Sequence, residues 1–260
     1  MEPIRDPAAL AARAAGLGGE TIRRAGAVVP VSTKGVGDYV TDVDRASEVA
    51  ITEFLRSATP GTHVVGEELG GTTADRYWLV DPLDGTTNFV HGFPIVAVSV
   101  ALIDGGRPVA GAVHAPFLGE TFAGARGRGA RVERADGSIE PLRVSDRPAD
   151  RAVVGTGFPF RNKPLLPRYL RAMTAALERF EDLRRPGAAA LDLAWVAAGV
   201  FDGFFELALS PWDVAAGGLL IEEAGGVVTD WDGSASYLSG DILAGNPDVH
   251  PELLRLAAAG

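Results

Sequence analysis

Apolar and polar residues follow two different rhythms along this chain. Between about residues 94 and 132, short apolar runs are separated by turns that contain Gly and Asp, such as the run at 95–102 followed by the turn at 104–106. Apolar runs of this length, bounded by turn residues and with no helical repeat between them, predict an antiparallel meander. Further strands of this sheet are expected at 109–114 and 120–123.

The first part of the chain has the composition of a helix. Residues 6–27 are rich in Ala and Arg and predict a helix that begins at Asp6, although the glycines at 16–19 weaken it. The glycine-rich, polar segment from Lys34 to Asp38 predicts a mobile loop.

A second helix is predicted at 44–57, with Thr41 or Asp42 as its N-cap. Asp42 and Asp44 fit a capping role at this helix start. The apolar positions that recur at helical spacing are Ala46, Val49, Ala50 and Phe54. This pattern predicts that these four residues form the core-facing side of the helix.

The rhythm changes after residues 145–148, where Pro and polar residues indicate a linker. From there, short apolar runs alternate with helical patterns, which is typical of an α/β arrangement. The predicted helices cover 166–180, 188–198 and 213–224. The predicted strands cover 153–159 with its turn, 182–185, 203–206, 227–229 and 242–244.

Composition narrows the possible classes of protein. The chain has 260 residues, of which 47% are hydrophobic, so it can bury a sizeable core. Its net charge of −10 disfavours a general nucleic-acid binder or a membrane-surface protein. The absence of cysteine excludes a disulfide framework and a thiol nucleophile. The N-terminus has no apolar signal-peptide core, and the longest apolar run, at 188–201, is too short for a membrane span, so a cytoplasmic location is expected.

One segment carries most of the candidate chemistry. The apolar run at 77–80 predicts a buried strand, and Asp81 and Asp84 follow it. Pro82 is expected to turn the chain, so that Asp81, the Leu83 carbonyl and Asp84 face one point and offer hard oxygen ligands suited to Mg²⁺. The N–H groups of the next residues, 85–87, can hold an anion if a helix begins there. The alternative is a capped turn without a metal, because Asp-Pro and Asp-Gly are common turn dipeptides.

Two further segments could complete such a site. Glu67 follows an apolar run at 62–65, so it can lie at the end of a neighbouring strand. Asp213 follows Ser210, a plausible N-cap, and Pro211, which suits the first helical position. Their alternatives are a polar loop and an ordinary helix start.

At this point the sequence resembles the inositol monophosphatase family. The similar motifs are Gly66-Glu67-Glu68, Asp81-Pro82-Leu83-Asp84-Gly85-Thr86 and Trp212-Asp213-Val214-Ala215 with the Gly-Gly pair at 225–226. The resemblance runs from about Lys34 to Pro247, and the segments 156–160 and 190–194 resemble the bacterial inositol-1-monophosphatase branch in particular.

The resemblance implies a fold and an activity. The fold would be the layered αβαβα sandwich shared with fructose-1,6-bisphosphatase. This fold fits the two halves that the change of pattern predicts, an α+β half at 1–147 that carries the metal-binding motif and an α/β half at 148–260 that completes the site. The activity would be Mg²⁺-dependent, lithium-sensitive hydrolysis of a phosphomonoester, with inositol 1-phosphate as the expected substrate and a homodimer as the expected assembly.

The resemblance also implies ligands for two or three Mg²⁺ ions. Glu67, Asp81 and the Leu83 carbonyl would hold one ion, while Asp81, Asp84 and Asp213 would hold a second. A third, weaker ion would use Glu67 and water. A water activated by metal would attack the phosphate, without a covalent phosphoenzyme.

Other residues match family positions near the reacting groups. By resemblance, Asp44 pairs with the Thr86 hydroxyl and the two orient the attacking water, with Glu67 as a further catalytic residue. Lys34 lies in a loop that closes over the site. The substrate contacts carried over from the family are Asp84, Gly85, Thr86, Gly187, Ala189, Glu206 and Asp213.

Several alternatives stay open at the level of sequence. The chain has Ala188 where the bacterial branch commonly has a small polar residue, and Pro186 stiffens the same loop, which weakens the case for inositol. Fructose 1,6-bisphosphate, histidinol phosphate and 3′-phosphoadenosine phosphates are the rival substrates. A non-catalytic regulatory protein that retains the fold is the alternative from another class. An aspartyl-phosphate mechanism is rejected, because it requires two aspartates at positions i and i+2, whereas Asp81 and Asp84 are at positions i and i+3.

Overall fold

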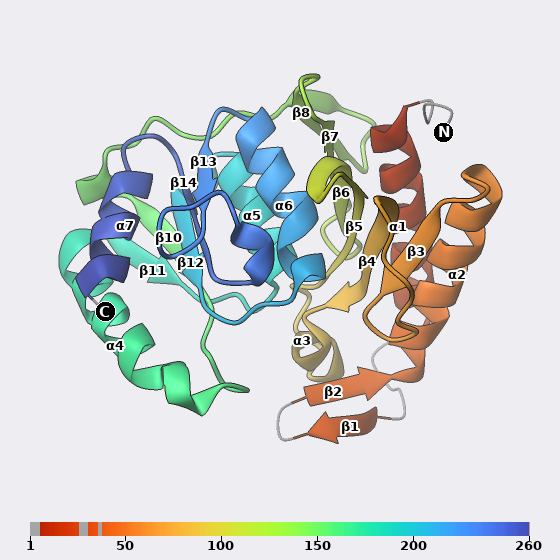
Figure 1. Cartoon of the computed structure of the whole chain (residues 1–260), viewed down its shortest axis with the longest axis horizontal. Coiled ribbons are helices and arrows are strands. Elements are labelled where there is room, and N and C mark those ends of the chain that lie inside the picture. The colour runs from red at the N-terminus through yellow and green to blue at the C-terminus, as the bar shows by residue number, and fades with distance from the viewer. Residues whose placement is uncertain (1–5, 26–30, 36–37, 260) are drawn as a thin grey trace.

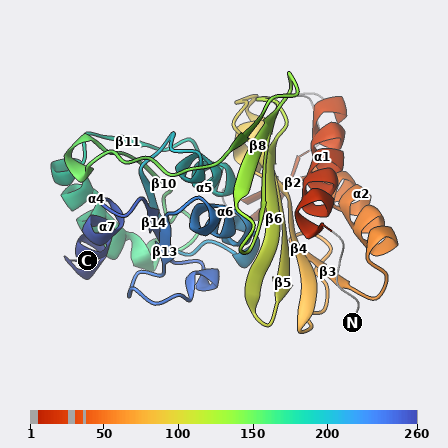
Figure 2. The same cartoon turned by 90° about the horizontal axis from the view of Figure 1, so that it is seen from above.

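The chain folds into five layers. The computed structural model describes residues 6–25, 31–35 and 38–259. Two sheets alternate with three pairs of helices in the order helix, sheet, helix, sheet, helix (Figures 1 and 2). The pairs, from one outer layer to the other, are α1 (Pro7–Ala25) with α2 (Asp42–Ala58), α5 (Ala189–Ala197) with α6 (Pro211–Glu223), and α4 (Leu166–Arg179) with α7 (His250–Ala259). The predicted αβαβα sandwich is confirmed.

The larger sheet has seven strands that follow one another in chain order. Its first two strands are parallel, and every later neighbouring pair is antiparallel, as the meander pattern predicted. The strands are β3 (His63–Gly66), β4 (Arg76–Asp84), β5 (Ala97–Asp104), β6 (Arg107–Ala115), β7 (Glu120–Ala125), β8 (Ala130–Arg134) and β9 (Ile139–Pro141).

The smaller sheet has five strands in the order β11-β10-β12-β14-β13. β10 is parallel to both of its neighbours, whereas β14 is antiparallel to both of its own. The strands are β10 (Val153–Thr156), β11 (Asp182–Arg184), β12 (Gly203–Glu206), β13 (Val227–Thr229) and β14 (Ile242–Gly245). Short 3₁₀ helices lie at Ala149–Arg151, Lys163–Leu165 and Tyr237–Ser239.

A separate hairpin precedes α2. β1 (Val31–Gly35) pairs with β2 (Asp38–Thr41) in antiparallel fashion. The loop predicted from Lys34 to Asp38 is therefore too long, because Lys34, Gly35 and Asp38 belong to the strands and only residues 36–37, which lie outside the described residues, connect them.

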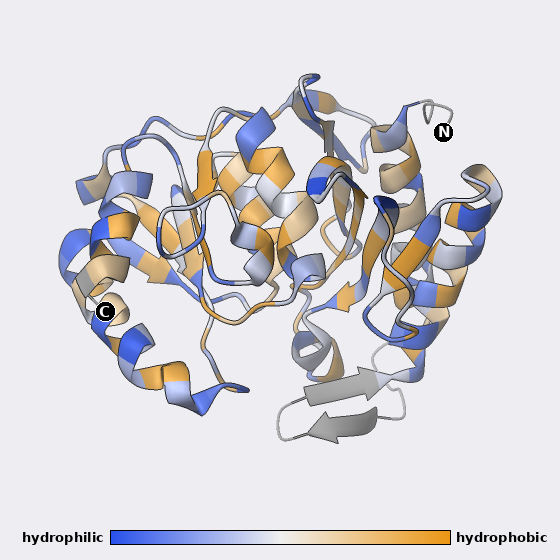
Figure 3. Ribbon diagram, viewed as in Figure 1, coloured by the Kyte–Doolittle hydropathy of each residue, from blue (hydrophilic) through white to orange (hydrophobic). Residues whose placement is uncertain are grey.

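Three apolar clusters hold the layers together. One lies between the sheets and includes Leu79, Leu191 and Phe204, another lies under α1 and α2, and the third lies under α4 and α7. Figure 3 shows the hydrophobic residues concentrated along the strands and on α5 and α6, with more hydrophilic residues on the outer helices. The first cluster joins residues from both sides of position 147, and the division of the chain into halves there stays a prediction.

The core-facing side of α2 differs from the predicted one. Ala46 and Val49 are exposed and Ala50 and Phe54 only half-buried. The buried residues are Val43, Asp44, Ser47, Glu48, Ile51, Thr52 and Leu55. The periodicity was interpreted wrongly because three polar side chains of this face are buried with hydrogen-bond partners, so hydropathy alone does not locate the face.

The glycines of α1 allow close helix packing. Gly18 lies against α2, where an added Cβ would come within 2.7 Å of Ser47 Oγ. The helix continues through these glycines to Ala25, although glycine weakens a helix in isolation. Within the described residues, no helix combines the length and the apolar character needed to cross a membrane.

Candidate metal centre

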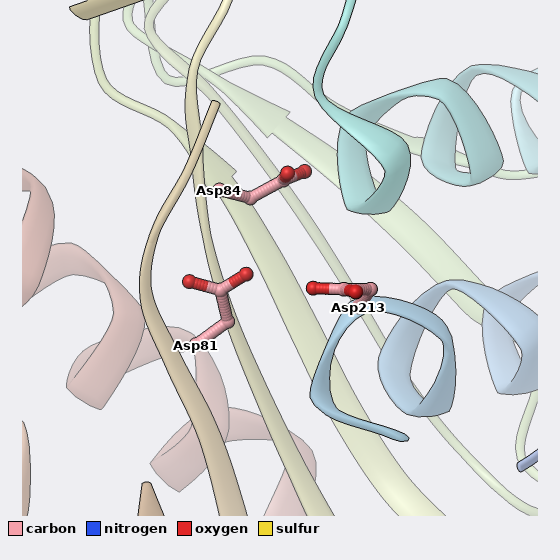
Figure 4. Close-up of side chains that lie close together, drawn as sticks. All are labelled: Asp81, Asp84 and Asp213. Carbon is pink, nitrogen blue, oxygen red and sulfur yellow. The ribbon is translucent and has the colours of Figure 1, made fainter. Parts of the chain in front are cut away.

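Three carboxylates converge where β4 meets the start of α6. One oxygen from each of Asp81, Asp84 and Asp213 lies within 4.8 Å of the other two. Figure 4 shows Asp81 and Asp84 on one strand, with Asp213 opposite them on the first turn of a helix. Asp81 is 1% exposed, and the other two are half-buried. Sequence positions 81 and 213 thus meet at one point, as the resemblance implied.

A β-bulge aims Asp81 and Asp84 the same way. The chain was expected to turn at Pro82, but β4 continues to Asp84. Asp81 pairs with Ser99 and Asp84 with Ala97, so β4 carries one more residue than β5 between these pairs. In a regular strand, residues i and i+3 point to opposite faces, and one extra residue restores the same face. Pro82 fits here because a bulge tolerates a residue without an N–H group.

Asp84 is tied to the N-terminus of α5. The N-cap of this helix is Ala188, which has no side chain that can accept a hydrogen bond. The Ala190 N–H donates to Asp84 Oδ2 at 2.7 Å instead. Asp84 therefore supplies the acceptor that a helix start requires, and this contact fixes its carboxylate.

Asp213 is held by the start of its own helix. Ser210 is the N-cap of α6 and Pro211 its first residue, as predicted. The Ser210 N–H donates to Asp213 Oδ2 at 2.7 Å. The Ser99 hydroxyl donates to the Trp212 carbonyl at 2.9 Å. Because Ser99 lies opposite Asp81 in the sheet, this bond places the start of α6 directly beside Asp81.

The carboxyl groups of the cluster hold protons more tightly than usual. Burial raises the pKa of Asp84 to about 7, and the neighbouring charge of Asp213 adds to this. Burial raises the pKa of Asp81 well above its ordinary value, with further contributions from Glu67 and Asp84. Burial also raises the pKa of Asp213. Like charges at this separation repel, so the site favours protons or cations.

A second polar group adjoins the cluster. The Thr86 hydroxyl lies 3.1 Å from Asp44 Oδ1 and 3.0 Å from the Leu83 carbonyl. Its single hydrogen can be donated to either oxygen. Asp44 is 2% exposed, and the Thr41 N–H donates to its Oδ2 at 2.9 Å. Asp44 therefore completes the capping box of α2, whose N-cap is Thr41, and also contacts Thr86. Burial raises its pKa.

Glu67 flanks the three carboxylates without joining their close group. It is half-buried, and its charge is the largest contribution after burial to the raised pKa of Asp81. The Glu67 N–H donates to the carbonyl of Val80, the residue before Asp81, at 3.2 Å.

The predicted substrate contacts lie around the start of α3 (Thr86–Val90). Gly85 precedes this helix with a φ of 87°, and an added Cβ would lie 3.0 Å from the Ile95 carbonyl and 3.3 Å from Ala188 Cβ. Gly187 has a φ of 90°. Ala189 is buried at the first turn of α5.

Glu206 lies at the end of β12. Burial raises its pKa to about 8, and the charges of Asp213 and Asp84 contribute in the same direction. Asp213 therefore acts electrostatically on a carboxyl group that comes from the smaller sheet.

The sequence interpretation missed the residues that position the site. The Asn88 side-chain amide donates to the Ile95 carbonyl at 2.7 Å and to the Pro186 carbonyl at 2.9 Å, which joins the two loops predicted to hold substrate. Asn88 lies two residues after Thr86, the last residue of the metal motif, and this short spacing was the available signal. Ser99 and Ala190 had no such signal, because their roles depend on tertiary contacts.

The residues fit a hard divalent cation. The donor set consists of carboxylates and the Leu83 carbonyl, whose second lone pair remains available beside the Thr86 contact. Oxygen donors of this kind suit Mg²⁺, and the described cluster contains no imidazole or thiolate that would favour a softer metal.

Comparison with known proteins decides the family. The model of the inositol monophosphatase family matches residues 1–259. The chain belongs to this family. Membership of this family, together with the similar solved structures given below, supports a phosphatase. Phosphatases of this family usually use metal ions.

The relatives extend over the whole chain. The Putative Nus factor SuhB of Neisseria meningitidis is 43% identical, with 100% of this chain and 99% of the relative covered. The Nus factor SuhB of Pseudomonas aeruginosa is 46% identical, with coverage of 98% and 95%. The structure of extragenic suppressor protein suhB from Bartonella henselae is similar with a TM-score of 0.89 at 39% identity, covering 97% and 98%. The IMPase from Thermotoga maritima has a TM-score of 0.87 at 31% identity, covering 98% and 97%.

Proposed function

We propose that this protein is a Mg²⁺-dependent phosphomonoester hydrolase that converts inositol 1-phosphate to inositol and phosphate. The observation that carries the proposal is the group formed by Asp81, Asp84 and Asp213, in a chain that belongs to a phosphatase family. A chain with a net charge of −10 needs bound cations to attract an anionic substrate.

Two or three Mg²⁺ ions would be held by Glu67, Asp81, the Leu83 carbonyl, Asp84 and Asp213. When bound, such ions lower the pKa of water and offset the negative charge on the phosphate and the leaving alcohol. The N–H contacts to Asp84 and Asp213 orient these carboxylates before a cation arrives.

Thr86 and Asp44 would handle the proton of the attacking water. The Thr86 hydroxyl can accept a hydrogen bond from that water and pass a proton to Asp44 Oδ1, 3.1 Å away. The water oxygen then forms a bond to phosphorus, the bond from phosphorus to the alcohol oxygen breaks, and the alcohol takes a proton from solvent. Glu67 would help to hold the water, and the N–H groups of Gly85 and Thr86 would bind the phosphate.

The alcohol part of the substrate would lie toward the smaller sheet. Glu206 would bind a substrate hydroxyl, and the backbone at Gly187 and Ala189 would contact the ring. A neutral Glu206 can donate as well as accept a hydrogen bond, and its pKa of about 8 keeps it largely neutral at pH 7 in the absence of cations.

A substrate with a second anionic group, such as fructose 1,6-bisphosphate, is the second candidate. The Arg185 guanidinium lies 5.3 Å from the ring centre of Phe158 and 5.4 Å from that of Phe160. Its charge acts on Glu206, so it lies near the proposed alcohol side. An exposed arginine there can bind a second phosphate.

A phosphate-release assay tests the proposal. Inositol 1-phosphate, fructose 1,6-bisphosphate, histidinol phosphate, 3′-phosphoadenosine 5′-phosphate and glycerol 2-phosphate are each incubated with Mg²⁺, with EDTA, and with Asp84→Asn. We expect turnover of inositol 1-phosphate that requires Mg²⁺ and falls at least about 100-fold in Asp84→Asn. Folded protein that releases phosphate from none of them in saturating Mg²⁺ would refute the proposal.

A non-catalytic role is the candidate from another class, because several relatives carry the name Nus factor SuhB. That role predicts a partner protein whose binding Asp84→Asn leaves intact. We also propose a cytoplasmic homodimer that lithium inhibits. Light scattering at micromolar concentration tests the dimer, and LiCl in the assay above tests inhibition.

A further inference from the structure

The buried face of α2 contacts two of the segments that supply the candidate metal centre, namely the segment around the end of β4 and the loop at 66–69. Asp44, Ser47 and Glu48 are at most 2% exposed. Asp44 contacts Thr86, and the Ser47 hydroxyl donates to the Pro82 carbonyl at 2.9 Å. The remaining residue, Glu48, has no place in the reaction described above.

Glu48 binds the loop that carries Glu67. The Glu68 N–H donates to Glu48 Oε2 at 2.7 Å, and the Leu69 N–H donates to Glu48 Oε1 at 2.9 Å. On the other side of Glu67, a Cβ added to Gly66 would lie 2.0 Å from Glu48 Oε1. The carboxylate therefore occupies the space that Gly66 leaves open and contacts the chain both before and after Glu67.

Two backbone bonds close the same loop. The Gly66 N–H donates to the Gly70 carbonyl at 3.0 Å, and the Glu67 N–H donates to the Val80 carbonyl at 3.2 Å. The second bond ties Glu67 to the strand that carries Asp81. Glu48 supplies the side-chain part of this arrangement, since it accepts the N–H groups of the two residues that follow Glu67.

The burial of Glu48 needs a reason beyond packing. A carboxylate that is 1% exposed carries a large desolvation cost unless hydrogen bonds offset it. Bonds from N–H groups to a charged acceptor are stronger than neutral ones and fix the geometry of both partners. Residues that orient metal ligands from behind commonly change metal affinity by about 10- to 100-fold when they are altered.

We propose that Glu48 is a positioning residue for the candidate metal centre, because its buried carboxylate fixes the segment 66–69 and thereby holds Glu67 beside Asp81. The inference rests on the proposed function in one respect, namely that Glu67 is a cation ligand. It adds a residue of α2 that touches neither cation nor substrate.

Calorimetric titration of the purified full chain with Mg²⁺ tests the proposal. Glu48→Gln keeps the size of the side chain but turns an NH₂ group toward one of the two N–H donors. We expect it to weaken Mg²⁺ binding about 10-fold. Glu53→Gln, the same change at an exposed position of α2, should bind Mg²⁺ as the unaltered protein does.

Two further readouts separate positioning from general stability. In the phosphate-release assay, Glu48→Gln should need about 10-fold more Mg²⁺ for half-maximal activity, while its substrate KM at saturating Mg²⁺ stays unchanged. Gly66→Ala disturbs the same contact from the side of the loop, because its Cβ would lie 2.0 Å from Glu48 Oε1 and should displace the carboxylate. We therefore expect Gly66→Ala to weaken Mg²⁺ binding as well. It also serves if Glu48→Gln does not fold.

The outcomes distinguish this inference from the proposed function. If the unaltered protein binds Mg²⁺ and Glu48→Gln and Gly66→Ala bind it equally well, the positioning role is wrong and the proposed function stands. If the unaltered protein binds no Mg²⁺ and releases no phosphate, the proposed function is wrong and the inference fails with it. A loss of thermal stability in Glu48→Gln without a change in Mg²⁺ affinity also overturns the positioning role.

Discussion

Glu206 should make the cation-depleted protein less stable as the pH rises above neutrality. Its pKa is raised to about 8 in the folded protein, against an ordinary value of 4.5. Between these two values the folded protein holds a proton that the unfolded chain has lost. Stability is therefore highest at low pH, as far as this group is concerned, and is lost as the pH rises through the folded pKa.

The size of this effect follows from the two pKa values. From pH 7 to pH 9, a group with a folded pKa of about 8 lowers the free energy of unfolding by about 1.4 kcal/mol. Asp84, with a pKa of about 7, adds about 0.4 kcal/mol in the same direction. Burial lowers the pKa of His114 to about 4 and also lowers that of His250, so these folded groups are already neutral in this range.

Urea unfolding in EDTA at several pH values measures the effect. We expect the unaltered protein to lose at least about 2 kcal/mol between pH 7 and pH 9, because burial also raises the pKa values of Asp81 and Asp192 well above their ordinary range. Glu206→Gln should lose about 1.4 kcal/mol less. Glu53→Gln, at an exposed position, should follow the unaltered protein. An unfolding free energy that stays constant or rises over this range, or a Glu206→Gln curve parallel to the unaltered one, would show that Glu206 is not held protonated.

Two further predictions concern one side chain and one backbone position. Thr86→Val should lower kcat by about 10²- to 10⁴-fold, since it removes the hydroxyl that contacts Asp44, whereas Thr86→Ser should keep most of the activity in the phosphate-release assay. Gly18→Ala should destabilise the protein by about 1–3 kcal/mol in urea unfolding, because its Cβ would lie 2.7 Å from Ser47 Oγ and 2.8 Å from Ile51 Cδ1. Gly16→Ala, whose Cβ meets nothing within 4 Å, should instead be neutral or stabilising by up to about 1 kcal/mol.

The carboxylates of the site could be found from sequence because their spacing is local. Asp81 and Asp84 are three residues apart after an apolar strand, and Asp213 follows an N-cap and a proline. These patterns indicate a strand end and a helix start, which are the places where such side chains gather. The layered fold followed in the same way from an antiparallel rhythm and a later α/β rhythm, together with the family resemblance.

The orientation of these groups could not be found from sequence, because it depends on contacts between distant segments. The bulge at Pro82 is defined by pairing with β5, and a proline alone indicated a turn. The capping of α5 by Asp84 depends on Ala188 having no acceptor of its own and on a carboxylate that is 106 positions earlier than Ala190.

The prediction of the core-facing side of α2 was wrong for a related reason. Hydropathy places apolar residues inside, and this rule holds where burial is the main source of stability. Asp44, Ser47 and Glu48 are buried because each satisfies groups of a site loop. At such a face, the polar residues that are unusual in a core are the ones that connect the helix to the candidate metal centre.

The three carboxylates of the centre are each held by a backbone N–H group. The donors are Leu83 at 3.0 Å for Asp81, Ala190 at 2.7 Å for Asp84, and Ser210 at 2.7 Å for Asp213. These bonds oppose the repulsion that would otherwise separate like charges in a buried place. Because these bonds prevent the carboxylates from moving apart, their mutual repulsion persists in the folded protein. It therefore favours the binding of protons or of cations. The N–H contacts to Asp84 and Asp213 lower the pKa values of these groups, whereas burial raises them, so both effects determine the pH range in which the cation-depleted protein loses stability.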